Sequence, residues 1–467
     1  MSKPINPGTP SDGLAACACS GWSRAEMLRG AAAQAGRGLP SIEPGMPLPA
    51  GTGLDRRSFL LRSAGLTMAV YGAASMSPRA FEEGIEDAMA AGPADAVLVS
   101  VFLSGGIDSL SVLAPTGDAA YTTLRPTLAL PPDPSRVFAE DSRLQWAAET
   151  DKLSTLHGEG KVTVLPCIGY ASPNQSHFTS RHYWEVGETN PQGQVGWLGR
   201  YIDQHGSSNN PLQGLALDSK LAPSLATASK PVAAVSDLSN YSFTANGVNS
   251  PVATPMLQEF GALGGLSTGD PELGKAREAT ATTSSLREQL SASVGTPATG
   301  YPNNTFGRRM ASLAALLASP LPLKVVSVQA AGGYDTHADQ ATTLPANLTT
   351  ISDTLFAFQR DLETRGIADR VLLHVWSEFG RRGRENGSGT DHGAGGISFL
   401  IGNKANGTMV ETFPGLSGAG LDGGGNLRAT SDFRGVYCSL LEDWLNVDAG
   451  PIIPGADSLP RYALIDP

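Results

Sequence analysis

The sequence is poor in several features that would assign it to a common class of protein. It holds only 4 cysteines in 467 residues, and neither Cys17 with Cys19 nor Cys167 with Cys438 has zinc-knuckle spacing. If the protein is exported, Cys167 and Cys438 could form a disulfide, and two buried free thiols are the alternative. Only 16% of the residues are charged, and the formal net charge is -11. Nucleic-acid binding needs a basic surface, so we expect no nucleic-acid partner.

Long apolar runs are also lacking. The run at 64–74 is too short to cross a bilayer as a stable helix, and no other stretch is long and apolar enough. It follows Asp-Arg-Arg-Ser-Phe-Leu-Leu at 55–61, a pattern that is typical of a twin-arginine export signal. The alternative is a chance arginine pair before an apolar helix. We therefore expect the twin-arginine translocase as a partner during export and a periplasmic or extracellular location.

The composition changes along the chain. Residues 1–54 are rich in Gly, Ala, Pro and Ser without a sustained hydrophobic period, and we expect them to be disordered. Residues 55–92 form the export signal and a linker. The remainder, 93–467, is long enough for one large α/β domain or for two smaller ones. Apolar spacing within this part predicts helices at 306–318 and 343–365.

A carboxylate and an imidazole follow one predicted strand. The apolar run at 323–330 leads into Gly-Gly-Tyr-Asp-Thr-His at 332–337, where two glycines allow a sharp turn before Asp335 and His337. Ligands of an open α/β sheet bind at the carboxyl ends of its strands, and these two side chains suit Zn²⁺, Mn²⁺ or Fe. The alternative is a helix-capping Asp335 beside a surface His337.

The first predicted strand, at 96–103, ends in Ser-Gly-Gly-Ile-Asp-Ser at 104–109. One interpretation is an ATP pyrophosphatase loop, whose backbone amides cradle pyrophosphate. The other makes Asp108 a metal ligand that the glycines bring close to the ion. The expected export favours the metal ligand, because ATP is scarce outside the cytoplasm.

The second predicted strand, at 161–167, is followed by Ser176 and His177. Ser176 could cap a helix, and a serine hydroxyl beside free helix N–H groups could attack an anionic substrate. A plain helix cap is the alternative. His177 is a candidate ligand or acid/base group, whereas His182 is expected in packing or on the surface.

The last chemical motifs flank a further strand at 371–376. Ser-Glu-Phe-Gly-Arg at 377–381 closes this strand, and Gly-Thr-Asp-His-Gly at 389–393 precedes the next one. We expect His374, inside the strand, to be a satisfied core histidine. Arg381 could clamp a substrate oxygen bidentately, and a solvated loop arginine is the alternative.

Taken together, these motifs resemble an exported bacterial family, the domain of unknown function 1501 (DUF1501). Further matching pieces are Asn-Gln-Ser-His-Phe, Gly-Trp-Leu-Gly-Arg-Tyr and Asp-Phe-Arg-Gly-Val-Tyr. The resemblance runs from about residue 96 to the C-terminus, and it implies that 93–467 form a single domain. The family is grouped with the alkaline phosphatase-like superfamily, which implies a three-layer α/β sandwich with a mostly parallel central sheet.

The superfamily binds two metal ions at the ends of parallel strands, and the resemblance implies roles for residues in matching places. Asp108 matches the aspartate after the first strand, and Ser176 matches the nucleophile at a helix start after the second. Asp335 and His337 match the pair that follows a later strand, and His392 matches the last histidine.

The sequence departs from this pattern at Glu378, which stands where the superfamily has an Asp-His pair. His177 could supply the missing imidazole, or only one ion could bind. A second register places the pair at Asp391 and His392, but it leaves no later histidine for the last position. The expected cofactor is one or two divalent ions (Zn²⁺, Mn²⁺, Mg²⁺ or Ca²⁺). The candidate ligands are Asp108, Asp335, His337, Glu378, Asp391 and His392.

The resemblance implies hydrolysis of a phosphate- or sulfate-type ester on a small molecule or a polymer. Metal ions would polarise the ester oxygens, and either Ser176, with His177 nearby, or a metal-bound hydroxide would attack in line. The sulfatase pattern Cys-x-Pro-x-Arg is absent, which disfavours a formylglycine sulfatase. The main alternative is a secreted binding or assembly protein with a degenerate site, because a fold does not confer activity. The pyrophosphatase loop remains a third possibility.

Overall fold

The computed structural model describes residues 94–235 and 298–466, apart from 209 and 219. It also describes the backbone of 68–71 and scattered positions between 255 and 296. The predicted leader at 1–54 lies outside the described residues, as does the export signal except for 68–71. Among the described helices, none combines the length and the apolar character needed to cross a membrane.

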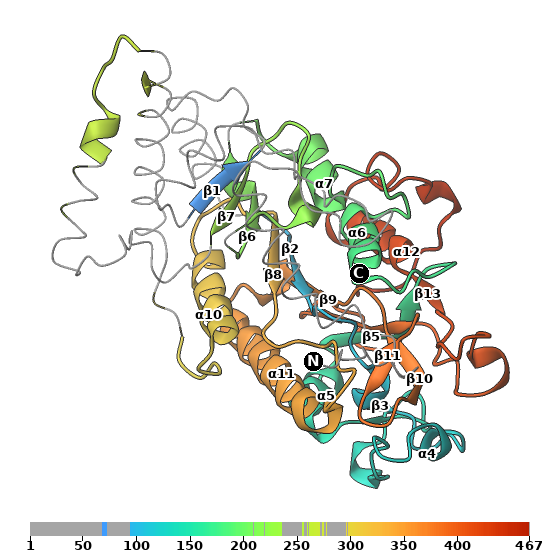
Figure 1. Cartoon of the computed structure of the whole chain (residues 1–467). Coiled ribbons are helices and arrows are strands. Elements are labelled where there is room, and N and C mark those ends of the chain that lie inside the picture. Colours follow the sequence, from blue (N-terminus) through green and yellow to red (C-terminus); the bar gives the residue numbers. More distant parts are fainter. Residues whose placement is uncertain are drawn as a thin grey trace, which may run out of the picture.

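Among the described residues, nine strands form a sheet at the centre of the molecule, in the order β1-β7-β6-β8-β2-β9-β12-β5-β13 (Figure 1). Five of the neighbouring pairs are parallel, and the three pairs β1-β7, β9-β12 and β12-β5 are antiparallel. The strands are β1 (Met68–Tyr71), β2 (Val97–Phe102), β5 (Val162–Gly169), β6 (Gly214–Ala216), β7 (Val232–Val235), β8 (Val325–Gln329), β9 (Val371–Trp376), β12 (Gly396–Ile401) and β13 (Ser431–Asp432).

Helices cover both faces of this sheet. Val97, Val99 and Val101 of β2 pack into one apolar cluster with α5, α10 and α11. Leu98 and Phe102 face the opposite way and pack with α6, α7 and α12. Figure 1 shows the two helix groups on opposite sides of the sheet. The helices are α5 (Asp151–Gly158), α6 (His177–Val186), α7 (Trp197–His205), α10 (Thr305–Leu317), α11 (Gln340–Thr364) and α12 (Phe433–Ser439).

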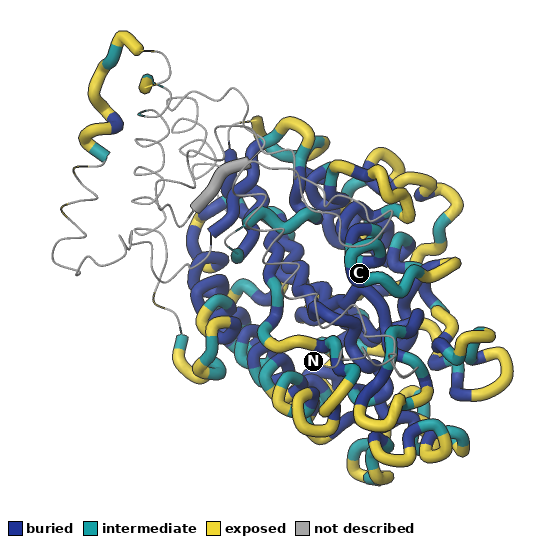
Figure 2. Tube along the Cα trace, in the orientation of Figure 1, coloured by how far each residue is buried: buried dark blue, intermediate teal, exposed yellow. Residues whose placement is uncertain are grey.

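This arrangement confirms the predicted three-layer α/β fold with a mostly parallel sheet. The central strands are buried on both faces, so they are almost continuously apolar, as in Val-Leu-Val-Ser-Val-Phe of β2. Figure 2 shows the buried sheet, with exposed residues mainly in the peripheral loops. Shorter elements at the periphery are α4 (Tyr121–Leu124), the pair β3 (Leu113–Ala114) and β4 (Gln145–Trp146), and the hairpin β10 (Arg381–Glu385) and β11 (Thr390–His392).

The chemical motifs all leave the sheet at one edge. Phe102, at the end of β2, is level with Gln329 at the end of β8 and with Trp376 at the end of β9. β5 runs in the same direction, because β12 lies between β9 and β5 and is antiparallel to both. The segments that follow these four strands therefore meet at the carboxyl edge, where α/β sheets bind ligands.

Candidate metal centre

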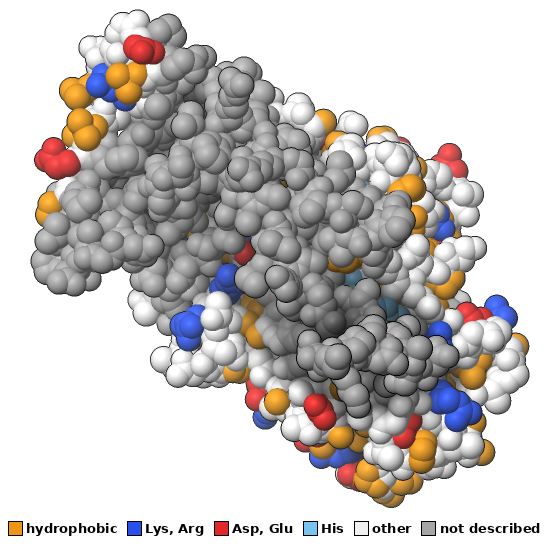
Figure 3. Space-filling view, in the orientation of Figure 1, with side chains coloured by type: hydrophobic (Ala, Val, Ile, Leu, Met, Phe, Trp, Pro, Cys, Tyr) orange, Lys and Arg blue, Asp and Glu red, His pale blue; other side chains and the backbone are white. Residues whose placement is uncertain are grey.

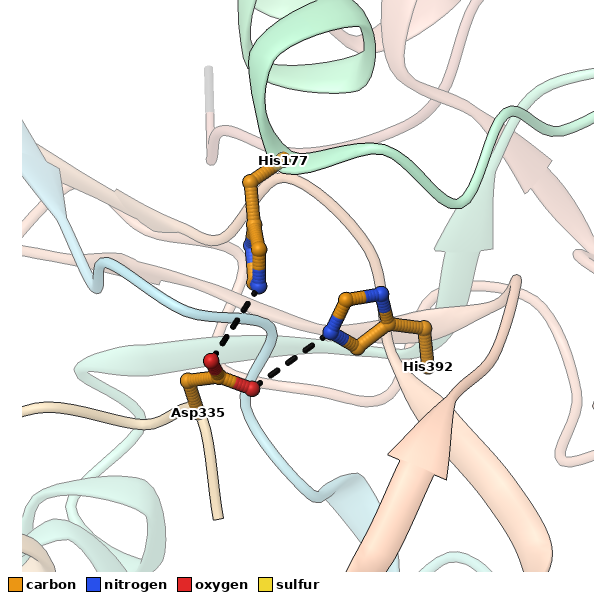
Figure 4. A group of neighbouring side chains, drawn as sticks. All are labelled: His177, Asp335 and His392. Atoms are coloured by element: carbon orange, nitrogen blue, oxygen red, sulfur yellow. Dashed lines mark hydrogen bonds and ion pairs between the residues drawn. The ribbon is translucent and has the colours of Figure 1, made fainter. Parts of the chain in front are cut away.

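Three side chains from distant segments converge at this edge (Figure 4). His177 is the first residue of α6, Asp335 follows β8, and His392 is the last residue of β11. His177 Nε2 lies 3.4 Å from Asp335 Oδ2, and His392 Nε2 lies 3.4 Å from Asp335 Oδ1. One donor atom from each residue lies within 4.8 Å of the others. The structure thus brings together three of the residues that the sequence singles out.

A fourth predicted residue, His337, lies beside this group. Its Nε2 is 3.1 Å from Asp335 Oδ1, and its ring centroid is 4.7 Å from that of His392. The His337 side chain is 21% exposed, and those of Asp335 and His392 are 15% exposed, so solvent reaches the group. On the face shown in Figure 3, histidine side chains come to the surface, and charged side chains of both signs are scattered over the described part of that face.

Each of these imidazoles has an oxygen at its other ring nitrogen. Nδ1 of His177 lies 2.8 Å from Glu378 Oε1, and Nδ1 of His392 lies 2.7 Å from the carbonyl oxygen of Gln175. Nδ1 of His337 lies 3.3 Å from Asp391 Oδ1. An oxygen acceptor at Nδ1 favours the tautomer with the proton on Nδ1, so that Nε2 of each ring could bind an ion beside Asp335. This is the orientation that metal-binding histidines need.

The carboxylate of Glu378 is fully buried, so it contacts His177 and not solvent. It accepts hydrogen bonds from the backbone N–H groups of Gly105 (2.9 Å) and Gly106 (3.1 Å). Consecutive backbone amides that point at one anion form a nest. The amides that a pyrophosphate would need in this loop therefore bind a carboxylate of the chain itself.

The two glycines are required by this geometry. Gly105 and Gly106 have φ angles of 119° and 74°, which favour glycine. A Cβ atom at Gly105 would lie 2.4 Å from the backbone nitrogen of Asp335, and one at Gly106 would lie 2.3 Å from the ring of Phe379. The double glycine therefore lets the loop after β2 pass close to the loops after β8 and β9.

Arg381 is fully buried beneath the cluster. Its Nη2 donates to Asp335 Oδ1 (2.6 Å) and to the Gly105 carbonyl oxygen, its Nε donates to the Gly106 carbonyl oxygen (2.7 Å), and its Nη1 donates to that of Thr390 (2.8 Å). This placement is at odds with the predicted substrate clamp, because the guanidinium is buried and donates to the chain itself. Arg381 instead fixes Asp335 and balances its charge.

Asp108 lies outside the cluster. Its fully buried carboxylate pairs with Arg125 through two bonds of 2.5 and 2.8 Å, and it accepts hydrogen bonds from Ser111 (2.6 Å) and Gln340 (2.6 Å). The predicted metal ligand is therefore occupied by an internal ion pair. The hydrogen bonds around Asp108 continue to the site, because Gln340 also accepts a hydrogen bond from the hydroxyl of Thr390, two residues before His392.

The sequence does not single out Arg125 or Gln340. A buried carboxylate requires a cation or several donors, and this rule could have pointed to an arginine partner for Asp108. It does not select among the 33 lysines and arginines of the chain. Only the packing of α4 and α11 around the loop after β2 does so.

Electrostatics keep Asp335 ionised. Burial raises the pKa of Asp335, but contact with the three imidazoles and with Arg381 outweighs burial and lowers the pKa to well below its usual range. Burial lowers the pKa of His392, and the charges of His177 and Arg381 act in the same direction. For His177, burial lowers the pKa, whereas the two carboxylates beside the ring outweigh it and raise the pKa. An ionised carboxylate beside these rings is suited to hold a cation.

The sequence profile of the family described as "Protein of unknown function (DUF1501)" matches residues 169–412, more than half of the chain. The chain belongs to this family. The match includes His177, Asp335, His337 and His392, so the whole cluster lies inside the DUF1501 region. No curated protein matches this chain.

Several solved structures are similar to this DUF1501 chain. A protein in the alkaline phosphatase superfamily from Vibrio parahaemolyticus is 10% identical and has a TM-score of 0.36, with 88% of this chain and 80% of that chain covered. A sulfatase from Pseudoalteromonas sp. is 10% identical, with 82% and 72% covered and a TM-score of 0.31. A phosphonate monoester hydrolase from Silicibacter pomeroyi is 12% identical, with 78% and 75% covered and a TM-score of 0.30. Because these TM-scores lie below 0.5, no residue role follows from them.

Two further predicted site residues, Ser176 and Asp391, lie next to the histidines of the cluster. Ser176 is the N-cap of α6, where its hydroxyl accepts a hydrogen bond from the backbone N–H of Thr179 at 3.5 Å, as predicted for a cap. It precedes His177 directly. Asp391 has a half-exposed side chain that contacts Nδ1 of His337 and the amide of Asn386. Asp391 thus lies behind a candidate ligand, on the side away from Asp335.

The structure also bears on predictions for two cysteines and two histidines outside the cluster. Cys167 and Cys438 are free and buried, so the alternative of two thiols is the one that the structure shows. His182 is buried in packing, as predicted. His374 is buried as predicted, but neither ring nitrogen has a hydrogen-bond partner among the described residues, and burial lowers its pKa to about 3. It is a core histidine, and the prediction that it is satisfied was wrong.

The donor set fits a metal ion. In a tetrahedral zinc site with bonds of about 2.0–2.1 Å, neighbouring donor atoms lie about 3.3–3.4 Å apart. The three contacts between imidazole Nε2 atoms and Asp335 measure 3.1 to 3.4 Å. Charge-assisted hydrogen bonds are shorter, at about 2.7–2.9 Å. His177, Asp335 and His392 would therefore hold a divalent ion, with His337 beside them.

Proposed function

We propose that this chain is a metal-dependent hydrolase of phosphate- or sulfate-type esters. The convergence of His177, Asp335 and His392 at the carboxyl edge of the sheet supports this proposal. A nitrogen-rich donor set with one carboxylate suits Zn²⁺ or another first-row divalent ion better than Ca²⁺ or Mg²⁺. The group is partly exposed, so an ester on a small molecule or on a polymer could reach it.

A bound ion would polarise the ester and stabilise charge that develops on the transferred group. The residues of the chain supply the other requirements. Glu378 and Arg381 hold His177 and Asp335 in place, so these ligands need no reorganisation during the reaction. Ser176 stands at the N-terminus of α6, where the helix dipole favours an anionic group. We assign Ser176 the attack on the ester. Its Oγ forms the bond to phosphorus or sulfur, the alcohol leaves with the proton that the hydroxyl gives up, and water then releases the phosphate or sulfate and restores the serine.

A second candidate function is binding without catalysis. It is favoured by the positions of Asp108 and Glu378, because both carboxylates are committed to internal partners. A two-metal hydrolase would have fewer ligands here than it needs. The two functions differ in turnover, which a binding protein lacks, and not in metal content.

The test uses the purified full chain with 4-nitrophenyl phosphate and 4-nitrophenyl sulfate as substrates. We expect hydrolysis of at least one of them, its loss on treatment with EDTA, and its recovery with Zn²⁺ or Mn²⁺. Asp335→Asn should lower kcat/KM by more than about 100-fold, because a ligand contributes more than the outer partners, whose loss costs about 10–100-fold. His205→Gln, an exposed histidine on α7, is the matched control. Bound metal without turnover of any ester would support the binding protein instead.

We also propose export by the twin-arginine route, on the basis of the arginine pair Arg56 and Arg57 before an apolar run. These residues lie outside the described structure. Replacing both by lysine should retain the protein in the cytoplasm of a host with a twin-arginine translocase. Unchanged export of the double variant, measured by cell fractionation, would contradict this proposal.

A further inference from the structure

The two segments that carry Asp335 and His392 are joined behind the site by one buried amide, the side chain of Gln340 at the start of α11. We propose that Gln340 is a positioning residue of the metal centre, which sets the placement of Asp335 and His392. It acts through Thr336 and Thr390 and does not bind the ion. This inference rests on the proposed function, because Asp335 and His392 are candidate metal ligands, but it is tested on metal binding and stability and not on turnover.

The oxygen of this amide joins two segments that each supply a candidate ligand. Gln340 Oε1 accepts hydrogen bonds from the hydroxyls of Thr336 (2.9 Å) and Thr390 (2.7 Å). Thr336 directly follows Asp335, and Thr390 is the first residue of β11, which ends at His392. The backbone N–H of Thr390 also donates to the carbonyl oxygen of Thr336 at 3.0 Å. One side-chain oxygen therefore holds the loop after β8 against β11.

The nitrogen of the same amide is held by an ion pair. Gln340 Nε2 donates to Asp108 Oδ2 (2.6 Å) and to the hydroxyl oxygen of Ser111 (3.2 Å). Asp108 is an anion paired with Arg125, so its oxygens can only accept hydrogen bonds. The NH₂ group must therefore face Asp108, which turns the oxygen of the amide towards the two threonines. The ion pair of Asp108 and Arg125 thus orients the amide that joins the two segments.

This hydrogen-bond network is buried and complete. The amide of Gln340 donates two hydrogen bonds and accepts two, which fills all its positions. Thr336, Thr390 and Asp108 are buried as well. A fully paired buried network is rigid, and metal ligands that such a network holds in place bind an ion more tightly than ligands that must be gathered. Loss of the amide would therefore weaken metal binding beyond any loss of stability.

The same helix offers a matched control in Gln359. This residue is also fully buried, and its amide donates to Glu363 (3.0 Å) and to Asn403 (2.8 Å). At about 1.5 Å per residue, Gln359 lies about 28 Å from Gln340 along the helix. Replacing Gln359 by methionine removes buried hydrogen bonds from α11 without touching the site.

The experiment uses the full chain, stripped of metal with EDTA, as wild type, Gln340→Met and Gln359→Met. Competition with a chromophoric chelator gives the Kd for Zn²⁺, and the visible absorption of bound Co²⁺ reports the geometry of the ligands. The melting temperature of the metal-free protein reports stability. Thr390→Val keeps the shape of the side chain and removes one hydroxyl, and it is the second variant should Gln340→Met fail to fold.

We expect both glutamine variants to lower the melting temperature of the metal-free protein, because each leaves buried groups without partners. Gln340→Met alone should weaken Zn²⁺ binding, by about 10-fold or more, and change the Co²⁺ spectrum. Thr390→Val should weaken binding by less. Added to Gln340→Met, it should cause no further loss, because both substitutions break the same hydrogen bond.

Two results would overturn the inference while the proposed function stands. One is a Kd and a Co²⁺ spectrum that are unchanged in Gln340→Met or, if that variant does not fold, in Thr390→Val. The other is an equal loss of affinity in Gln359→Met, which would show that binding follows stability in general. Absence of any bound ion in the wild type would refute both the inference and the proposed function.

Discussion

The substitution Asp108→Asn separates a structural role of this residue from the metal-ligand role that the sequence indicates. In the structure, the Asp108 carboxylate is fully buried and pairs bidentately with Arg125, which is also fully buried. Burial raises the pKa of Asp108, but the charge and hydrogen bonds of Arg125 outweigh burial and lower the pKa below its usual value, so the carboxylate is ionised. Asparagine has nearly the same shape but no charge. The guanidinium of Arg125 would then remain buried without a counter-charge.

The expected cost follows from that unpaired charge. Removing one partner of a buried ion pair destabilises a protein by about 3–5 kcal/mol. At about 2.1 cal/mol/K of unfolding entropy per residue, a domain of about 370 residues should lose about 4–6 °C in melting temperature. The metal content of the folded variant should remain that of the wild type, because Asp108 contributes no atom to the cluster.

The assay combines calorimetry with elemental analysis, on both proteins in the same excess of Zn²⁺. Asp457→Asn, an exposed carboxylate in the C-terminal segment, is the matched control and should change stability by less than about 0.5 kcal/mol. An Asp108→Asn protein that melts like the wild type but binds no metal would refute this account, because it would make Asp108 a ligand.

Three further predictions concern residues in other parts of the structure. Ser176→Ala should lower ester hydrolysis by about 1,000-fold or more, while the lost helix cap costs only about 1 kcal/mol; a normal rate would remove Ser176 from the reaction. With the two N-terminal cysteines replaced by serine, a thiol reagent should modify the protein only after unfolding, because burial raises the pKa of Cys167 to about 12 and that of Cys438 to about 11. Rapid labelling of the native protein would contradict this. Burial raises the pKa of Glu363, but hydrogen bonds with Lys161, Gln359 and Arg360 outweigh burial and lower the pKa from 4.5 to about 2. The stability that this ion pairing adds is complete above pH 4.5 and is lost as the pH falls towards 2. Between these pH values, the free energy of unfolding of the wild type should therefore fall by about 1 kcal/mol more than that of Glu363→Gln. Equal falls in the two proteins would contradict the ion pairing.

Apolar runs between glycine turns located the central strands well. The predicted strand at 371–376 coincides with β9, and the helices predicted at 306–318 and 343–365 coincide with α10 and α11 to within a few residues. These elements are buried, so their sequences must carry the period of the structure that they form. The short strands β6 and β13 carry too few residues to show a period.

The sequence alone also singled out Asp335, His337 and His392, which stand beside strand ends at one edge of the sheet. It could not determine what each carboxylate does there. Glu378 binds amides 273 and 272 residues away, and Gln340, one of the donors to Asp108, is 232 residues from it. Whether a carboxylate faces a cavity or an internal donor depends on such distant partners. Hydrophobic period fixes which face of a strand is buried, but only the packed structure decides which polar groups are left to face one another.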